Sequence, residues 1–389
     1  MTMPALRQFD LTIIGASFAG LACARTAALR GLNVAVVDAQ SQPGARIRTT
    51  GLLVKEAVDA LDLPAHLMRK VRGVRLYAPN LNYLDLHAPG YFFQATSTGA
   101  LLQWMAEEAR RAGATFYFGT RFDSALQDDD GLSLPTLGIR TRYLVGADGA
   151  RSRVGQFFRL GLNRRFLVGA EIECEPISAM DERFLHCFAD SGIAPGYIGW
   201  AVPGVGVTQI GAAALRNRKP DLEALGSVLE RLWRIEAPRI FERRSGLIPV
   251  GGPVHPLGRG RVLLIGDAAG LVSPLTGGGI HTALSFGRRA AQLVADWLLD
   301  CGPHPLAQFS REIPRFGLKR ALRRVADFAP PNALVNLLLM TPPMRAFAQR
   351  VYFHRRASAL SFEDWEFQFE QSRFAPQPPA PDSERLRCI

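Results

Sequence analysis

The stretch from Arg261 to His281 holds the residues of this chain best suited to chemistry. An apolar run leads into Gly266 and Asp267, and a proline turn and three glycines follow before a helix. An aspartate after a strand can accept hydrogen bonds from ribityl hydroxyls, and glycines let the backbone approach a flat ring or a phosphate. The helix N-terminus offers free N–H groups to negative charge. The order of these residues predicts a flavin site. Its expected cofactor-binding residues are Gly266, Asp267, Pro274, Gly277, Gly278, Gly279 and Ile280.

A glycine turn near the N-terminus lies between an apolar run over 11–14 and an Ala-rich helix over 18–29. A β-branched strand over 34–37 completes an expected βαβ unit. Asp38 ends that strand, about 20 residues beyond the glycines, where a carboxylate binds ribose hydroxyls. The alternative to a cofactor site is that these glycines form an ordinary turn of an α/β protein. The expected cofactor-binding residues of this unit are Gly15, Ser17, Phe18, Ala19, Gly20 and Asp38, with Ser17 in the usual place of a second glycine.

A third turn, over 146–149, again places an aspartate after an apolar strand. We expect Asp148 and Gly149 to contact the cofactor and Ser152 to cap a helix that begins near Arg153. A capped turn without a functional role is the alternative.

Two further side chains are weaker candidates. Arg46, in the loop after the second strand, is expected to face a phosphate or the flavin pyrimidine, although exposed loop arginines are commoner. His281 follows the last glycine turn, where a histidine satisfied within its own helix is commoner than one facing the flavin.

The three turns, in this order and separation, resemble those of flavoproteins with the para-hydroxybenzoate hydroxylase fold. That group carries a glycine turn for the ADP part of FAD, a mid-chain Asp-Gly motif and a late Gly-Asp motif near the ribityl chain. The resemblance covers 11–299 and implies FAD as the cofactor. Within the group, the segment 266–280 is most similar to geranylgeranyl reductases, whose equivalent segment has a Pro-Leu-Thr-Gly turn.

The segment 196–203 is similar to the Tyr-x-Trp-x-x-Pro segment of these reductases, which lines the cavity between substrate and flavin. The resemblance makes Tyr197, Trp200 and Pro203 candidates to line a substrate cavity, although aromatic residues in a strand usually cover a core or a sheet face. Tyr197 and Trp200 are one residue further apart here, and 46–51 replaces a Cys-Gly pair, so no role of that cysteine carries over. No catalytic residue is identified.

The predicted fold class is α/β, with a Rossmann-like FAD-binding domain in discontinuous segments and an inserted, mostly antiparallel β-sheet substrate domain. A C-terminal helical region follows. The expected boundaries are 1–74, 95–160 and 256–305 for the FAD-binding domain, 75–94 and 161–255 for the substrate domain, 306–374 for the helical region, and 375–389 for a disordered Pro-rich tail.

Composition narrows the class of protein. The chain has 389 residues, 48% hydrophobic, with no apolar run long enough to span a membrane, and we expect a cytoplasmic protein. Five scattered cysteines show no metal-ligand spacing, so no metal site is predicted. The net charge of +11 suits an anionic membrane surface or substrate better than nucleic acid, for which no aromatic-basic pattern is present. The basic helices after Pro305 are either a solvated face or a membrane-surface patch.

The resemblance implies an FAD-dependent oxidoreductase that reduces carbon–carbon double bonds of an isoprenoid or other long apolar lipid by hydride transfer from reduced flavin. The runner-up is a flavin monooxygenase that hydroxylates or epoxidises an apolar or aromatic substrate. A third hypothesis is a flavin-binding, membrane-associated protein without turnover. The electron donor is NAD(P)H or ferredoxin, and the sequence leaves the oligomeric state open.

Overall fold

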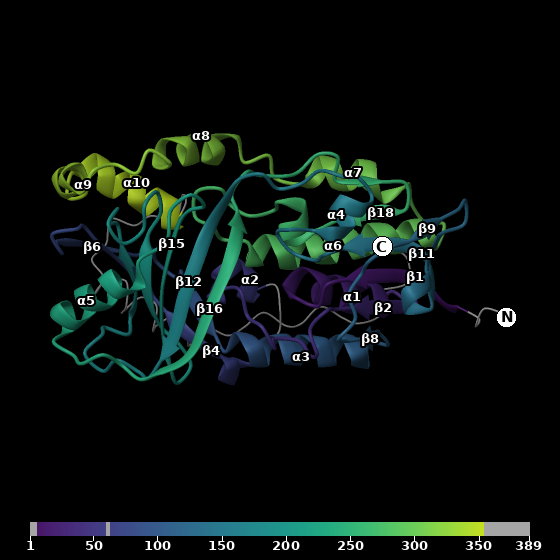
Figure 1. The fold of residues 1–389 in the computed structure, drawn as a ribbon, viewed down its shortest axis with the longest axis horizontal. Helices are drawn as coiled ribbons and strands as arrows, with labels where there is room; N and C mark the ends of the chain where they lie inside the picture. The colour runs from purple at the N-terminus through teal and green to yellow at the C-terminus, as the bar shows by residue number, and fades with distance from the viewer. Residues whose placement is uncertain (1–5, 60–62, 354–389) are drawn as a thin grey trace.

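The computed structural model describes residues 6–59 and 63–353 and has two halves along its long axis, each built on a large sheet (Figure 1). The eight-stranded sheet follows the order β17-β18-β11-β1-β2-β8, with β10 beside β11 and β9 beside β10. Its strands are β1 (Arg7–Ile14), β2 (Val34–Val37), β8 (Thr115–Tyr117), β9 (Leu126–Gln127), β10 (Leu132–Leu134), β11 (Ile139–Gly146), β17 (Gly258–Arg259) and β18 (Val262–Leu264).

Four neighbouring strands of this sheet, β18, β11, β1 and β2, run parallel. Parallel strands end at the same edge of a sheet, and ligands of open α/β sheets bind at that edge. The strands β1, β2, β11 and β18 are followed there by Gly15, Asp38, Asp148 and Asp267, respectively. Segments that are far apart in the sequence therefore meet in one place, and the predicted α/β fold class is confirmed.

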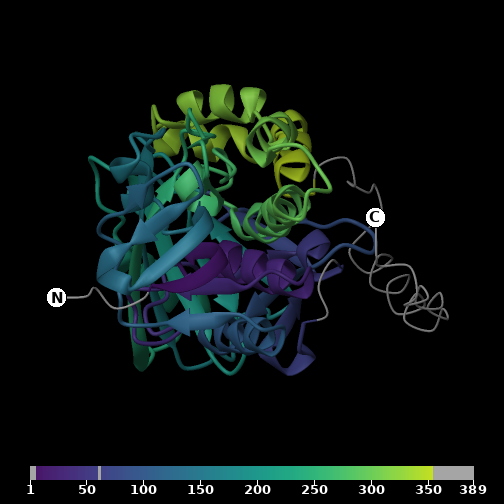
Figure 2. The ribbon, with the colours of Figure 1, turned by 90° about the vertical axis from the view of Figure 1, so that its right-hand side faces the viewer.

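Three long helices lie side by side in this half, with α1 between α3 and α6 (Figures 1 and 2). They are α1 (Phe18–Leu29), α3 (Thr98–Arg111) and α6 (Ile280–Leu298). Gly287 of α6 packs so closely on α1 that an added Cβ would lie 2.5 Å from the carbonyl oxygen of Ala19. The helix and the second strand of the predicted βαβ unit have the expected bounds, whereas β1 begins at Arg7, four residues before the apolar run over 11–14.

The seven-stranded sheet of the other half has the order β16-β12-β15-β14-β13-β5-β6 and is antiparallel except where β13 meets β5. Its strands are β5 (Gly73–Tyr77), β6 (Tyr83–Leu86), β12 (Phe166–Cys174), β13 (Phe184–Phe188), β14 (Gly199–Pro203), β15 (Thr208–Leu215) and β16 (Ile240–Pro249). Helix α5 (Leu222–Trp233) packs on one face through Leu225 and Leu229, together with Ile210 and Ala212 of β15.

One prediction about this sheet is wrong. Tyr197 is not a strand residue but lies before β14, in a turn where its N–H bonds to Ala194 O. A second tight turn precedes β15, where Gly204 N–H bonds to Val207 O at 2.8 Å and Gly206 has φ +70°.

Shorter elements connect the two halves. A three-stranded sheet, β3-β7-β4, lies beside α2. These elements and the remaining short helices are β3 (Leu52–Val54), β4 (Met68–Val71), β7 (Phe93–Thr96), α2 (Lys55–Asp59), α4 (Arg153–Phe157) and the 3₁₀ turns η1 (Ala65–Leu67), η2 (Pro135–Leu137) and η3 (Gly266–Ala269).

The C-terminal region is helical as far as the structure describes it. Its helices are α7 (Pro305–Glu312), α8 (Gly317–Ala326), α9 (Asn332–Leu338) and α10 (Pro342–Phe353). They run along one side of the molecule (Figure 1). Helix α9 follows the pair Pro330-Pro331, and α10 starts at the pair Pro342-Pro343. The rest of the predicted helical region and the predicted tail lie outside the described residues. Among the described helices, none combines the length and hydropathy needed to cross a bilayer.

Candidate cofactor and substrate site

The glycine turn after β1 closes against the second predicted turn. Gly15 has φ +113°, and a Cβ there would lie 2.3 Å from the carbonyl oxygen of Ala147. Gly266, in the third turn, comes equally close to α1, since its added Cβ would meet Ala19 Cβ at 2.7 Å. The structure therefore brings all three turns into contact around the start of α1.

The helix ends at this edge have unpaired donors. Ser17 at the N-cap of α1 and Gly279 at the N-cap of α6 give no side-chain cap, and neither helix has an acidic residue in its first turn. The first N–H groups of a helix have no partner within it and attract negative charge. Both ends thus suit an anionic group such as a pyrophosphate.

Asp38 holds the first turn in shape. Its Oδ2 accepts the N–H of Ala16 at 2.6 Å, and its Oδ1 accepts the N–H of Gln40 at 2.7 Å. An ionised carboxylate offers about four lone-pair sites. Two such sites stay open to ribose hydroxyls, as the predicted role of Asp38 requires.

The carboxylate of Asp267 has no hydrogen-bond donor among the described residues. It accepts no hydrogen bond from the described residues, and its Oδ1 lies 3.4 Å from where a Cβ on Gly279 would be. Burial raises its pKa to about 6. A partly buried carboxylate without a hydrogen-bond partner among the described residues fits the hydroxyls of a ribityl chain. This is the observation in the structure that best fits FAD.

The predicted loop from Pro274 to Gly279 is held between two elements. The hydroxyl of Thr282 in α6 donates to Gly279 O at 2.8 Å and to Leu271 O, and Tyr197 donates its hydroxyl proton to Thr276 O. A Cβ on Gly277 would lie 2.7 Å from that hydroxyl oxygen. Tyr197 thus connects the predicted substrate side to the predicted flavin loop.

The other predicted residues differ in exposure. Phe18, Ala19, Gly20 and Pro274 are buried, Gly149, Gly279 and Ile280 are partly buried, and Ser17, Arg46 and Gly278 are exposed. The N–H of Arg46 bonds to Gln40 Oε1 at 2.6 Å, and burial lowers the pKa of His281, whose Nδ1 has no partner among the described residues.

Asp148 makes its hydrogen bonds within its own turn. Its carboxylate accepts the hydroxyl of Ser152 at 2.6 Å and the N–H groups of Arg153 and Val154 at 2.6 and 3.0 Å. Ser152 in turn accepts the N–H of Gly155 at 2.8 Å, as the predicted cap of α4 should. Asp148 thus fixes the start of this helix, and a contact of Asp148 or Gly149 with the cofactor stays a prediction.

Replacing Asp148 with alanine should lower the free energy of unfolding by about 1–3 kcal/mol, because three donors lose their acceptor. Asp148→Asn keeps one acceptor oxygen and should lose less. The thermal unfolding midpoint of each apoprotein measures this difference. Equal midpoints for the alanine variant and the wild type would contradict the capping role.

The face of the seven-stranded sheet opposite α5 carries two of the three substrate-side candidates, Tyr197 and Trp200. Trp200 lies flat across Gly211, where an added Cβ would come within 2.5 Å of the indole ring. Tyr197 and Trp200 pack with Leu167, Ala213 and Val250 in one apolar cluster. Pro203, the last residue of β14, is buried, but the alternation of the strand turns it to the other face, the one that α5 covers.

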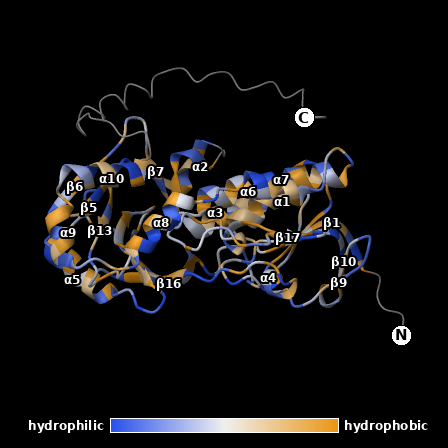
Figure 3. Cartoon of the chain, turned by 90° about the horizontal axis from the view of Figure 1, so that it is seen from above, coloured by the Kyte–Doolittle hydropathy of each residue, from blue (hydrophilic) through white to orange (hydrophobic). Residues whose placement is uncertain are grey.

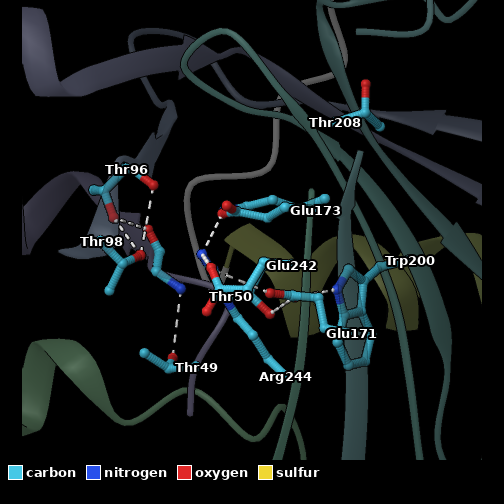
Figure 4. Close-up of polar contacts among 12 residues, drawn as sticks. Thr49, Thr50, Thr96, Thr98, Glu171, Glu173, Trp200, Thr208, Glu242 and Arg244 are labelled. Atoms are coloured by element: carbon cyan, nitrogen blue, oxygen red, sulfur yellow. Dashed lines mark hydrogen bonds and ion pairs between the residues drawn. The ribbon is translucent and has the colours of Figure 1, made fainter. Parts of the chain in front are cut away.

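Glu171, a buried acid on this face, was not predicted from the sequence. Glu171 accepts the indole N–H of Trp200 at 3.0 Å and the hydroxyl of Thr50 at 2.5 Å (Figure 4). Thr50 belongs to the loop in which the expected Cys-Gly pair is missing. The sequence did contain a signal for this acid. Side chains of β12 alternate between the two faces of the sheet, and this alternation puts Glu171 and Glu173 on the inward face, at positions that are otherwise small or apolar.

Comparisons with known proteins agree with this geometry. The family model described as an FAD binding domain matches residues 8–166. A digeranylgeranylglycerophospholipid reductase of Methanosphaera stadtmanae is 29% identical over 315 residues, which are 75% of this chain and 79% of that protein. A menaquinone reductase of Mycolicibacterium smegmatis is 29% identical over 378 residues, which are 88% of this chain and 92% of that protein.

Solved structures share the fold. A geranylgeranyl bacteriochlorophyll reductase-like protein of Thermoplasma acidophilum has a TM-score of 0.75 at 17% identity and covers 93% of this chain and 99% of its own. A flavin-dependent brominase has a TM-score of 0.67 at 15% identity and covers 94% of this chain and 98% of its own.

Fold, site and relatives together define an FAD-dependent oxidoreductase with the para-hydroxybenzoate hydroxylase fold. Within that class, the chain is similar in sequence to digeranylgeranylglycerophospholipid reductases and shares the fold of a geranylgeranyl bacteriochlorophyll reductase-like protein.

Proposed function

We propose that this enzyme reduces carbon–carbon double bonds in the polyprenyl chain of a lipid, with FAD held by the three turns around α1. One observation carries the proposal: the apolar cluster of Tyr197 and Trp200 is joined to the predicted flavin loop by the hydrogen bond from Tyr197 to Thr276 O. A long hydrocarbon chain on this surface would lie beside that loop.

Each part of the site has its own task in this proposal. When bound and reduced, FAD supplies a hydride to one alkene carbon. The helix ends of α1 and α6 bind the pyrophosphate, Asp38 binds a ribose and Asp267 binds the ribityl hydroxyls. Tyr197 and Trp200 position the hydrocarbon chain and exclude water.

The names of the relatives support the substrate class. They act on a digeranylgeranylglycerophospholipid and on menaquinone, which have different head groups and share a polyprenyl chain. We therefore propose that the chain recognises the polyprenyl part. The electron donor is proposed to be NAD(P)H or ferredoxin.

Anaerobic reoxidation tests this proposal. The purified holoprotein is photoreduced without oxygen, and vesicles that contain a polyprenyl glycerophospholipid or menaquinone are added. We expect the oxidised flavin spectrum to return with at least one of them, and fully saturated analogues should give no change. Reduced flavin that persists with every alkene, together with oxygen consumption on addition of an aromatic or polyprenyl substrate in air, would favour the monooxygenase instead.

We also propose that the C-terminal helices meet an anionic membrane surface, from which such a lipid would enter. The side chains of Leu318, Phe328 and Leu337 are 73%, 85% and 72% exposed. Lys319 and Arg324 lie on the same helix as Leu318, and the C-terminal helices mix hydrophobic with hydrophilic residues (Figure 3). Exposed apolar side chains beside basic ones favour binding to anionic lipid.

Vesicle co-sedimentation checks this surface. The double variant Phe328→Ser, Leu337→Ser should bind phosphatidylglycerol vesicles at least several-fold more weakly than the wild type. A matched double variant, Leu29→Ser with Leu126→Ser, changes residues that are 64% and 68% exposed elsewhere and should bind like the wild type. Equal binding by both variants would contradict the proposed surface.

A further inference from the structure

The buried acid Glu171 stands in a row of four residues across the inward face of the seven-stranded sheet. Arg244 of β16, Glu171 of β12, Gly211 of β15 and Trp200 of β14 are opposite one another in the strand pairing. Directly opposed residues share a face of the sheet. Because Gly211 has no side chain, the indole of Trp200 reaches across it to Glu171.

The charges around Glu171 do not balance. The side chain of Arg244 is 4% exposed. Among the described residues, it lies within ion-pair distance of three carboxylates, those of Glu171, Glu173 and Glu242. Glu242 is 41% exposed, so water stabilises its charge, and Arg244 balances Glu173. An ionised Glu171, only 6% exposed, would then be a buried negative charge without a close cation. Buried charges are costly unless paired, so one carboxyl of this group should be protonated.

The geometry shows which carboxyl that is. Nη2 of Arg244 contacts Glu173 at 2.6 Å and Glu242 at 2.7 Å, whereas Nη1 is 3.5 Å from Glu171 Oε1 and makes no hydrogen bond (Figure 4). Both donors to Glu171, from Thr50 and Trp200, converge on Oε2. Arg244 therefore gives its close contacts to Glu173 and Glu242, and Glu171 is the carboxyl of the three without a close cation, which makes it the one that carries the proton.

The electrostatic environment of the carboxyl agrees with this assignment. Burial raises the pKa of Glu171, and the negative charge of Glu173 raises it as well, against the hydrogen bonds from Thr50 and Trp200 and the charge of Arg244. The same face holds Gly169 and Gly211 beside Glu171 and the apolar cluster with Trp200 further along. A hydrocarbon chain on this surface would meet one neutral acid.

We propose that Glu171 is the proton donor of the alkene reduction, an assignment that rests on the proposed function. The hydride goes to one alkene carbon and the carboxyl proton of Glu171 to the other. The carbon–carbon π bond breaks, two C–H bonds form, the flavin is left oxidised and Glu171 is left as a carboxylate. Water then returns the proton to Glu171 before the next turnover.

The first test is the protonation state, which needs no substrate. Infrared spectra of the holoprotein at pH 7, recorded in H₂O and D₂O, should show a protonated carboxyl band that Glu171→Gln removes and that Glu223→Gln, at an exposed glutamate of α5, keeps. A spectrum in which Glu171→Gln removes no such band would overturn the assignment.

The second test is single turnover under anaerobic conditions. Glu171→Gln should retain FAD but slow flavin reoxidation by the lipid about 10²- to 10⁴-fold, the usual contribution of a general acid. Glu171→Asp should recover part of the rate. Wild-type rates in Glu171→Gln would overturn the proposal, whereas a wild type that no polyprenyl lipid reoxidises would refute the proposed function and leave the infrared result standing.

The pH profile separates a donor from a structural residue. The acid must be protonated to act, so the wild-type rate should fall as pH rises through the pKa of Glu171. Glu173→Gln removes a neighbouring negative charge and should move that fall to lower pH. A profile that Glu173→Gln leaves in place would contradict the proposal.

Discussion

Gly15→Ala is expected to lower the free energy of unfolding by about 3–6 kcal/mol and to give protein without bound FAD. The φ of +113° costs a residue with a side chain about 1–3 kcal/mol, and a methyl group 2.3 Å from Ala147 O forces the first two turns apart at further cost. Such a loss is a large part of the total stability of a folded domain. Thermal unfolding and the absorbance of the purified flavin measure both effects.

Gly113→Ala is the matched control. Gly113 has φ +108°, and nothing lies within 4 Å of an added Cβ, so the variant should lose only the conformational part, about 1–3 kcal/mol, and keep FAD. Equal losses of unfolding free energy in Gly15→Ala and Gly113→Ala would show that the contact between Gly15 and Ala147 is unimportant.

Asp267→Ala should weaken FAD binding about 10- to 100-fold, because a hydrogen bond to a charged acceptor contributes about 1.5–3 kcal/mol. Asp129→Ala is the control: Asp129 is an exposed aspartate outside the three turns, and this variant should bind FAD normally. Titration of each apoprotein with FAD gives the dissociation constants. An alanine variant at Asp267 that keeps its full yellow colour after extensive dialysis would contradict the ribityl role.

The same aspartate predicts a pH dependence. In the apoprotein the pKa of Asp267 is raised to about 6, above its unfolded value, so its stabilising effect is complete below about pH 4 and is lost as pH rises through 6. This loss should be no more than about 3 kcal/mol and absent in Asp267→Asn. Hydroxyl donors favour the ionised form, so FAD affinity should rise over the same interval. An affinity that is flat from pH 5 to 7 would count against this assignment.

The cofactor half of the protein was predictable because short-range patterns determine it. Glycine turns after apolar strands have few structural alternatives, and the parallel strands then bring Gly15, Asp148 and Asp267 to one edge. The role of Asp148 was less predictable, because its carboxylate serves the cap of its own helix as well as a motif that resembles a cofactor site.

The substrate half depends on pairing between distant strands. Glu171, Arg244 and Trp200 become neighbours only through the register of β16, β12, β15 and β14, and no local pattern specifies that register. The sequence resemblance pointed to Trp200 but not to the acid that it contacts. The position of Tyr197 outside a strand was not predicted either, because its hydrogen bond to Thr276 O joins segments that are far apart in the sequence.

The mass of the lipid product is the most direct test of the central claim. Photoreduced enzyme and a polyprenyl lipid are allowed to react anaerobically, and the lipid is extracted and analysed by mass spectrometry. We predict a product that has gained two hydrogens at a former double bond, and both should be deuterium when photoreduction and reaction are run in D₂O, because the N–H groups of reduced flavin and the carboxyl proton exchange with solvent. A lipid that returns unchanged, and gains an oxygen atom only when air is admitted, would contradict the assignment as an alkene reductase.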